Sequence, residues 1–404
     1  MVKPERRTRG DLLAAAAIAA VVAVVVAGFW WHSTARTTIS RPAKSPAVNP
    51  VAAKAVPGSL EQRWTAHSPR TLLPVVVGGV VLSGDGHTMA GRDPQSGEQV
   101  WSYTRDAELC AVSYVYDLAV AVYPDGRGCG QVSGIKAATG QRGPTRTSYA
   151  DKQVVVTSDG SAILSYGPTR LELWRSDLVR MLSYGEIDAP IKPVNTKLGS
   201  GCTLMSAAGT DAAVAVLEAC RDVNDLRLSL LTAAKEEDEP ETKHVPLPGI
   251  AADSDARVLA VTTTAAAVYL PVPQPRVVVY DDTGTTVSRT ELTSPPELTG
   301  AAPAVTHAGD YITWWTGSAV MVFDSKLDYR FTLEAPALGP ATMMAGKLLV
   351  PVADGLAVYD PTDGAREGLI TLTHPPGQGP VLPAAVGTSV VEQRESTLAG
   401  YVAN

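Results

Sequence analysis

The stretch GLAVYDPTDG, residues 355–364, joins a short apolar run to a tight polar turn. The same arrangement occurs as MAGRDPQSG at residues 89–97. Partial copies follow as IKAATG (135–140), VVVYDDTG (277–284) and MVFDSKL (321–327). A short apolar run that ends in an Asp- and Gly-containing turn is typical of a β-strand entering a hairpin. The stretch therefore indicates one unit of a repeated β-structure.

The repeat extends over most of the chain, with seven positions at which the strand-ending turn can be placed. Successive positions lie 36 to 56 residues apart, a range centred on the length of a four-stranded propeller blade. We attribute the longest interval to an insertion, AAKEEDEPETKHVPLPG (233–249), which we expect to be a solvated loop. The seven positions are Asp93, Ala137, Ser176, Thr232, Asp281, Asp324 and Asp360.

The two ends of the repeat region predict how the ring closes. TLAGY (397–401) matches TMAGR (88–92) of the first complete copy, and the chain ends before a fourth strand can follow. LEQRWTAH (60–67) supplies a candidate for that strand, because its Trp64 parallels Trp101 in GEQVWSY. Pairing this strand with the one around Tyr401 would remove two open sheet edges. We predict an all-β, eight-bladed β-propeller, with seven blades as the alternative if the region around Ser176 is miscounted.

Several polar and aromatic features of the repeat have a structural and a functional interpretation. Asp93, Asp281, Asp324 and Asp360 begin turns that Gly97, Gly284 and Gly364 help to form, and we expect them to bond the backbone rather than to form a ring of carboxylates. The acidic run 236–241 is expected to be solvated, with a cation or a basic partner as the alternative. Trp314 and Trp315 should point to opposite faces of one strand, where one could instead face a ligand.

The N-terminal part carries a separate signal. Leu12 to Trp31 contains no charged residue and is long enough to cross a bilayer. Basic residues before it and the indoles at its end predict a single-pass anchor with a cytosolic tail (1–11); a cleaved signal peptide is the alternative. Residues 32–58, rich in Pro, Ala, Ser and Thr, are expected to be an extended linker that leads to the propeller (59–404); its 22 residues from Thr37 to Gly58 would alone reach about 65–70 Å.

The four cysteines, Cys110, Cys129, Cys202 and Cys220, all follow the apolar segment. Within each pair the spacing is nearly equal, 19 and 18 residues. We predict the bridges Cys110–Cys129 and Cys202–Cys220, each inside one blade, with four free thiols as the alternative. Disulfides would place the domain in an oxidising compartment outside the cytosol.

The patterns DGHTMAGRDPQSGEQVW and DGLAVYDPTDGAREG resemble the repeat of quinoprotein-like propellers, in which Ala-x-Asp, a Thr-Gly or Ser-Gly turn and a Trp follow one another. With its N-terminal anchor, the Ala- and Val-rich chain also resembles single-pass membrane proteins of actinobacteria. Within the quinoprotein family the resemblance implies dehydrogenases that hold pyrroloquinoline quinone and calcium between a Trp and a vicinal disulfide. This chain has no Cys–Cys pair, and Trp101 occupies the outer-strand position that packs between blades.

We therefore expect no catalytic residue, no cofactor and no metal site. A net charge of −7 argues against nucleic acid as a partner. The prediction is a propeller that is anchored in the cytoplasmic membrane and lies outside the cytosol, where it acts as a non-catalytic binding or scaffold module for protein partners of the cell envelope. The alternatives are a sensor for a small molecule or glycan, or a quinoprotein-type enzyme, each using the axial funnel.

Overall fold

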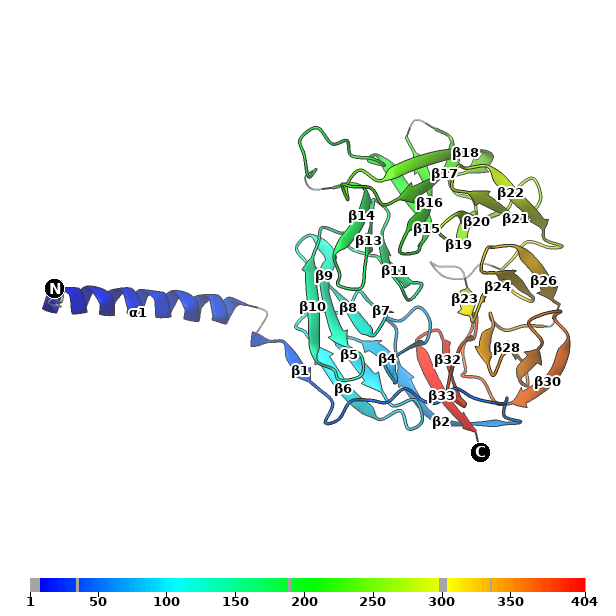
Figure 1. Cartoon of the computed structure of the whole chain (residues 1–404), viewed down its shortest axis with the longest axis horizontal. Helices are drawn as coiled ribbons and strands as arrows, with labels where there is room; N and C mark the ends of the chain where they lie inside the picture. Colours follow the sequence, from blue (N-terminus) through cyan, green and yellow to red (C-terminus); the bar gives the residue numbers. More distant parts are fainter. Residues whose placement is uncertain are drawn as a thin grey trace, which may run out of the picture.

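The computed structural model describes residues 8–33, 36–187, 190–221, 223–297, 304–334 and 336–403. In this part of the chain one long helix, α1 (Arg9–His32), precedes a ring of eight antiparallel sheets (Figure 1). Thr8 caps the helix, because its hydroxyl accepts from the N–H of Asp11 while the Asp11 carboxylate accepts from the N–H of Thr8. The segment Arg9–Trp31 is long and apolar enough to cross a membrane, and none of it is buried against the ring.

Each sheet is one blade, and its strands run in chain order from the axis outward, with two exceptions: blade 8 takes its outer strand from the start of the domain, and blade 1 has a fifth, outermost strand that precedes the other four in the chain. Blades 1 to 4 comprise β3 (Val75–Val77), β4 (Val80–Asp85), β5 (Thr88–Arg92) and β6 (Gln99–Thr104); β7 (Ala111–Val115), β8 (Leu118–Asp125), β9 (Gly128–Lys136) and β10 (Arg142–Thr147); β11 (Val155–Ser158), β12 (Ile163–Tyr166), β13 (Arg170–Trp174) and β14 (Arg180–Gly185); β15 (Cys202–Gly209), β16 (Ala213–Cys220), β17 (Asp225–Thr232) and β18 (Glu241–Ala251). Blades 5 to 8 comprise β19 (Arg257–Val261), β20 (Ala265–Leu270), β21 (Arg276–Asp281) and β22 (Thr286–Glu291); β23 (Val305–Ala308), β24 (Tyr311–Trp315), β25 (Val320–Asp324) and β26 (Tyr329–Leu333); β27 (Thr342–Met344), β28 (Lys347–Val352), β29 (Gly355–Tyr359) and β30 (Arg366–Thr371); β31 (Leu382–Val386), β32 (Ser389–Arg394), β33 (Thr397–Ala403) and β2 (Leu60–His67). The eight-bladed propeller predicted from the sequence is confirmed.

The repeated turn occupies the same place in seven of the blades. Each of the seven positions read from the sequence lies at or just after the end of the third strand of a blade. In blades 1, 3, 5, 6 and 7 the pairing of the third and fourth strands shifts by one residue immediately before this turn. Such a bulge bends the strand pair, so the same local sequence produces the same hairpin geometry in each of these blades.

The ring closes through the composite blade 8. β2 pairs antiparallel with β33, and Trp64 lies opposite Gly400 in the register. The same relation exists in blade 1, where Trp101 of β6 lies opposite Gly91 of β5. Because β2 and β33 come from opposite ends of the domain, their pairing closes the ring by joining a strand from its beginning to the last described strand.

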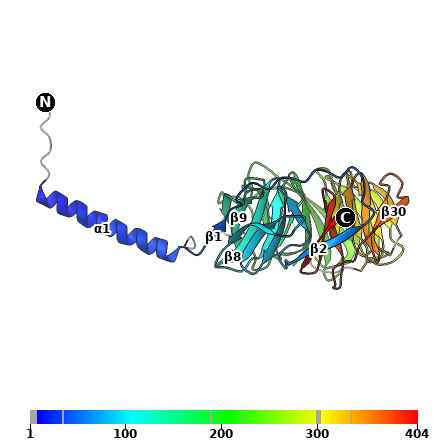
Figure 2. The same ribbon diagram turned by 90° about the horizontal axis from the view of Figure 1, so that it is seen from below.

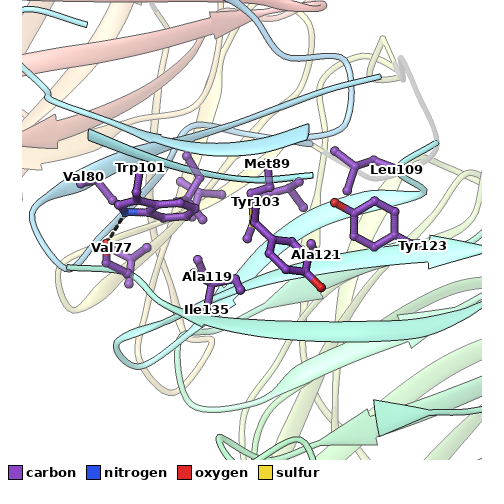
Figure 3. Packing of buried hydrophobic residues seen from close by; sticks show 14 residues of the cluster. Val77, Val80, Met89, Trp101, Tyr103, Leu109, Ala119, Ala121, Tyr123 and Ile135 are labelled. Atoms are coloured by element: carbon purple, nitrogen blue, oxygen red, sulfur yellow. Dashed lines mark hydrogen bonds between the residues drawn. The ribbon is translucent and has the colours of Figure 1, made fainter. Parts of the chain in front are cut away.

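Two tryptophans lie over a glycine of their own blade and bond to the neighbouring blade. The Trp101 indole N–H donates to the carbonyl of Ala137 in blade 2 at 2.6 Å, and the ring is only 1 % exposed (Figure 3). Trp64 repeats this with the carbonyl of Pro94 in blade 1, at 2.9 Å. A Cβ added to Gly91 would lie 2.3 Å from the Trp101 ring, and one added to Gly400 would lie 2.1 Å from the Trp64 ring. Trp101 therefore packs between blades, as the sequence predicted.

The two adjacent tryptophans of β24 pack in opposite directions. Trp314 belongs to the hydrophobic cluster shared with blade 5, whereas Trp315 belongs to the cluster shared with blade 7. Both are buried, at 0 % and 7 % exposure. Neither faces a ligand site, because both sides of an interior blade are covered by neighbouring blades.

We predicted that residues 233–249 form a solvated loop whose insertion explains the longest interval between repeated turns, and this was wrong. The extra residues lie in the connection 186–201 between β14 and β15. Part of the stretch 233–249 is the outer strand β18, which begins at Glu241 and pairs with β17. Its Pro residues and charges resemble those of a loop, yet an outer strand has one open edge and tolerates both.

The stretch 32–58 was expected to be an extended spacer, and this was wrong. β1 (Ile39–Arg41) pairs with β6 and adds a fifth strand to blade 1. Residues 42–58, called the strap below, then cross one face of the ring (Figure 2). Ala43 and Ala47 donate their N–H groups to Thr139 and Ala138 of blade 2, at 2.9 and 2.7 Å.

Beyond blade 2 the strap continues over the inner turns of three further blades. Val48 lies against Gly79 of blade 1 and Pro50 against Gly387 of blade 8, so closely that a Cβ on either glycine would be within 2.8 Å. Ala53 and Val56 pack on the cluster between blades 7 and 8. The strap therefore belongs to the folded domain and covers part of one face.

Candidate functional site

The turn aspartates are occupied by backbone hydrogen bonds. Asp93 accepts from the N–H groups of Gln95 and Ser96, at 2.9 and 2.8 Å. Asp281, Asp324 and Asp360 accept from N–H groups of their own turns in the same way. The carboxylates therefore hold the hairpins at the ends of third strands, and each lies in a different blade.

Both disulfides join the cysteines that were predicted to pair. Cys202 and Cys220 lie directly opposite each other in the β15–β16 pair, as the hairpin interpretation requires. Cys110 and Cys129 do not follow that plan, because Cys110 precedes β7 and Cys129 lies on the third strand, β9. The difference arises because β8 already ends at Asp125, so the turn brings Cys129 into the next strand.

The acidic run does not form a solvated loop, and that expectation was wrong. Asp238 is only 4 % exposed, and it accepts from Asn195 and from the N–H of Ile191 in the connection 186–201. Glu236 bonds Lys192 and Asn195. The run therefore folds back from blade 4 onto the outer side of blade 3, where the inserted connection receives it.

A buried carboxylate organises the outer side of blade 3. Glu172 on β13 is 3 % exposed; it accepts from the guanidinium groups of Arg170 and Arg180, the latter at 2.9 Å, and forms an ion pair with Arg146 at 3.2 Å. The indole of Trp174 and the hydroxyl of Ser148 donate to it as well, each at 2.8 Å. Burial alone would raise the pKa of Glu172, but the three arginine charges hold it below its usual value.

The three arginines come from separate strands, and each has a second attachment. Arg146 on β10 donates to the Ser148 hydroxyl at 2.7 Å and to the Leu178 carbonyl at 2.9 Å. Arg170 on β13 donates to the Glu186 carbonyl at 2.7 Å. Arg180 on β14 also pairs with Glu237 of the acidic run. Since every guanidinium is held at two or more points, the cluster is rigid.

A pocket of about 220 Å³ opens beside this cluster, at the rim between blades 2 and 3. We call it the rim pocket. Its wall includes Arg127, Arg146, Arg170, Arg180, Tyr149 and Asp238. Convergent charged groups in a concave site make it the best candidate for ligand binding in the described part of the chain.

A second depression, of about 480 Å³, lies around the exposed Tyr116 on the β7–β8 turn. Its charged groups are Asp117 on the β7–β8 turn, Lys136 at the end of β9 and Asp177 on the β13–β14 turn. It has no buried charged side chain comparable with Glu172 or Arg170, so it offers little that would fix the orientation of a ligand.

Two other buried carboxylates tie blades together. Glu218 on β16 accepts from Tyr184 and Arg227, each at 2.8 Å, next to the Cys202–Cys220 bridge. Because both of those sulfurs are bonded to each other, the group is structural. Glu392 on β32 pairs with His374 at 2.9 Å.

The rim pocket was missed at the sequence level. The signal available was a set of arginines at residues 127, 146, 170 and 180, which fall on three strands and one turn of two blades. Nothing in their spacing shows that they meet, because the meeting depends on which face of each strand looks toward the neighbouring blade.

The fold and its N-terminal helix define the class: an eight-bladed β-propeller preceded by one apolar helix. No family model matches the chain, and no curated protein matches it either. The quinoprotein-like resemblance is therefore not confirmed.

Solved structures do share the fold. Sqt1 of Saccharomyces cerevisiae matches with a TM-score of 0.52 and 10 % identity, over 87 % of this chain and all of that one. Sqt1 of Chaetomium thermophilum matches with a TM-score of 0.51 and 13 % identity, over 89 % of this chain and all of that one. At such low identity these similarities establish the propeller fold alone.

Proposed function

We propose that this protein is a membrane-anchored, extracytoplasmic propeller that serves as a non-catalytic binding or scaffold module for protein partners of the cell envelope. The observation that carries the proposal is the short distance along the chain between the apolar helix and the ring. α1 ends at His32 and β1, already part of blade 1, begins at Ile39. The connecting residues 33–38 reach about 20 Å when fully extended.

This connection supports a particular placement of the ring. With α1 in a bilayer, blade 1 would lie at the membrane surface, and the other blades would extend away from it. Arg36 stacks over the Trp31 ring at 4.2 Å, and Arg41 ends β1. An indole and nearby basic side chains suit the interface with anionic lipid headgroups. A scaffold held in this way would meet partners that are themselves at the membrane.

The two disulfides support a location outside the cytosol, since cytosolic thiols are kept reduced. The rigid strands and broad loop faces of a propeller support binding of large partners. Both observations fit the same placement, with the helix as the anchor and the ring outside.

The test is a protease site inserted after Ser33 in the otherwise intact protein. External protease added to spheroplasts should release the ring from the membrane fraction. A ring that is cut only after lysis would overturn the extracytoplasmic placement, and a ring that is already soluble before protease would indicate a cleaved signal peptide.

Partner binding is tested by crosslinking in intact cells before the protease step. Specific envelope proteins should be crosslinked to the intact protein and be lost from a version that begins at Arg36 and is exported by a cleavable signal. This version keeps β1 and the strap, which belong to the fold. Identical crosslinks from both versions would remove the anchor from the proposal, and recovery of bulk membrane protein alone would refute the scaffold role.

A further inference from the structure

The rim pocket is lined by an unusual set of charges. Among its ionised wall residues, four are arginines and one, Asp238, is an acid. Arg170 is 4 % exposed and Arg146 is 15 % exposed, whereas Arg127 is 48 % exposed at the mouth. Buried guanidinium groups are planar donors in a fixed arrangement that matches an oxoanion.

Acids outside the pocket wall pair with each of these arginines. Glu172 is shared among three arginines, Glu237 engages Arg180, and Asp125 lies 3.7 Å from Arg127. In the described part of the chain the buried Nε of Arg170 has no hydrogen-bond partner. The pocket is therefore lined by guanidinium groups, and beneath its wall one buried N–H, on Nε of Arg170, lacks an acceptor in the described part of the chain.

The chain itself shows which kind of acceptor the arginines of this pocket bind. Glu237, in the acidic run, pairs with Arg180 through its side chain, and its carbonyl accepts from the N–H of Ser183 at 2.6 Å. An acidic segment thus already lies along the open edge of β14, with one carboxylate on an arginine of the pocket. A second acidic segment at the neighbouring arginines would repeat a contact that this surface makes within its own fold.

Volume and charge select the kind of anion. About 220 Å³ holds one small group and is below the usual range of small-molecule sites. Asp238 in the wall, with Glu172 and Glu237 behind it, would repel a dianion such as phosphate more strongly than a monoanion. A carboxylate satisfies both conditions.

We propose that the rim pocket binds one carboxylate of an acidic segment of a protein partner, either a side chain or a chain end. The inference rests on the proposed function only in that the ligand belongs to a protein partner; the pocket itself can be tested without a membrane topology. Arg127 at the mouth meets the incoming charge, and Arg146 and Arg170 hold it from below.

The probe is a blocked peptide of four Glu-Gly repeats that carries an uncharged fluorophore. Its binding to the full-length protein in detergent is measured by fluorescence anisotropy. We expect Arg127→Gln to weaken binding at least about tenfold, as expected for the loss of one charge-assisted hydrogen bond. Arg127 lies outside the Glu172 cluster, so this variant should fold. The matched control is Arg289→Gln, an exposed arginine on the outer strand β22 of blade 5, which should leave binding unchanged.

Further peptides distinguish the two possible sources of the carboxylate, a side chain and a chain end. A Gln-Gly peptide with blocked ends should not bind, and the same peptide with a free C-terminus should bind only if a chain end is the natural ligand. Arg146→Lys keeps the charge but removes the planar guanidinium with its fixed set of donors, and it should also weaken binding of the acidic peptide. Far-UV circular dichroism of each variant checks that the fold is retained.

Three results would overturn the inference: equal binding of the acidic and amide peptides, equal losses for Arg127→Gln and Arg289→Gln, or inorganic phosphate that binds more tightly than the peptide carboxylate. If the peptide measurements overturn the pocket inference while the crosslinks in cells are intact, the scaffold proposal still stands. Peptide binding without extracytoplasmic crosslinks would refute the scaffold and keep the pocket.

Discussion

The contact between Trp101 and Gly91 predicts a strong energetic coupling between two single substitutions. The Trp101 ring is buried at 1 % exposure and lies over Gly91, where an added Cβ would be 2.3 Å from the indole. The backbone of Gly91 is not in the left-handed region, so the cost of Gly91→Ala comes from this collision alone. Overpacking of this kind costs about 1–3 kcal/mol.

The same substitution should behave differently once the ring is removed. Trp101→Ala should cost about 3–5 kcal/mol for the lost side chain, with about 1 kcal/mol more for the lost bond to the Ala137 carbonyl. In that background Gly91→Ala meets empty space and should be neutral, or stabilising by about 0.5–1 kcal/mol because alanine loses less backbone entropy on folding. The coupling in the double-mutant cycle is therefore at least about 1 kcal/mol, with a change of sign expected.

The assay is urea unfolding of the full-length protein in detergent, followed by far-UV circular dichroism, because tryptophan fluorescence changes with the substitution. Gly368→Ala on β30 serves as the control, since an added Cβ there would meet nothing within 4 Å. Additive effects of the two substitutions, within about 0.5 kcal/mol, would refute the interlocking of ring and glycine.

Three other predictions concern the bridge in blade 4, a buried ion pair and the strap. Replacing Cys202 and Cys220 by serine opens a loop of 18 residues and should lower the free energy of unfolding by about 3 kcal/mol, measured by urea unfolding; a midpoint unchanged from the oxidised protein would contradict this. Burial lowers the pKa of His374, but its hydrogen bonds to Glu392 and to two carbonyls outweigh burial and raise the pKa overall. Burial also raises the pKa of Glu392, so both members of the pair contribute stability that is present at low pH and is lost as pH rises through their folded-state pKa values; an unfolding midpoint measured from pH 5 to 9 should show this decline in wild type and not in the double variant His374→Gln, Glu392→Gln. Ala47→Pro removes the N–H that bonds Ala138 and should speed proteolysis of the strap, whereas Ala52→Pro at an exposed position should not; equal cleavage of both would show that the strap does not depend on this bond.

The sequence predicted the features that repeat or that pair over short separations. The polar turn after the third strand recurs at residues such as Asp93 and Asp360, because a hairpin needs an Asx-type bond wherever it occurs. The parallel between Trp64 and Trp101 located the closing strand, since the same indole-over-glycine contact is used at both places. The Cys202–Cys220 bridge followed from strand ends that must meet in a hairpin.

The tertiary structure alone decided the strap and the rim pocket. Residues 42–58 have the composition of a free linker, and their contacts with glycines at the blade turns and with the carbonyls of Ala138 and Thr139 in blade 2 make them part of the fold. Arg170 and Arg180 meet Glu172 within blade 3, but Arg146 stands on β10, so its contact with Glu172 depends on the packing of blade 2 against blade 3. A strand pattern determines which side chains share a face of one sheet, but contacts between faces of different sheets are set by the twist and closure of the whole ring.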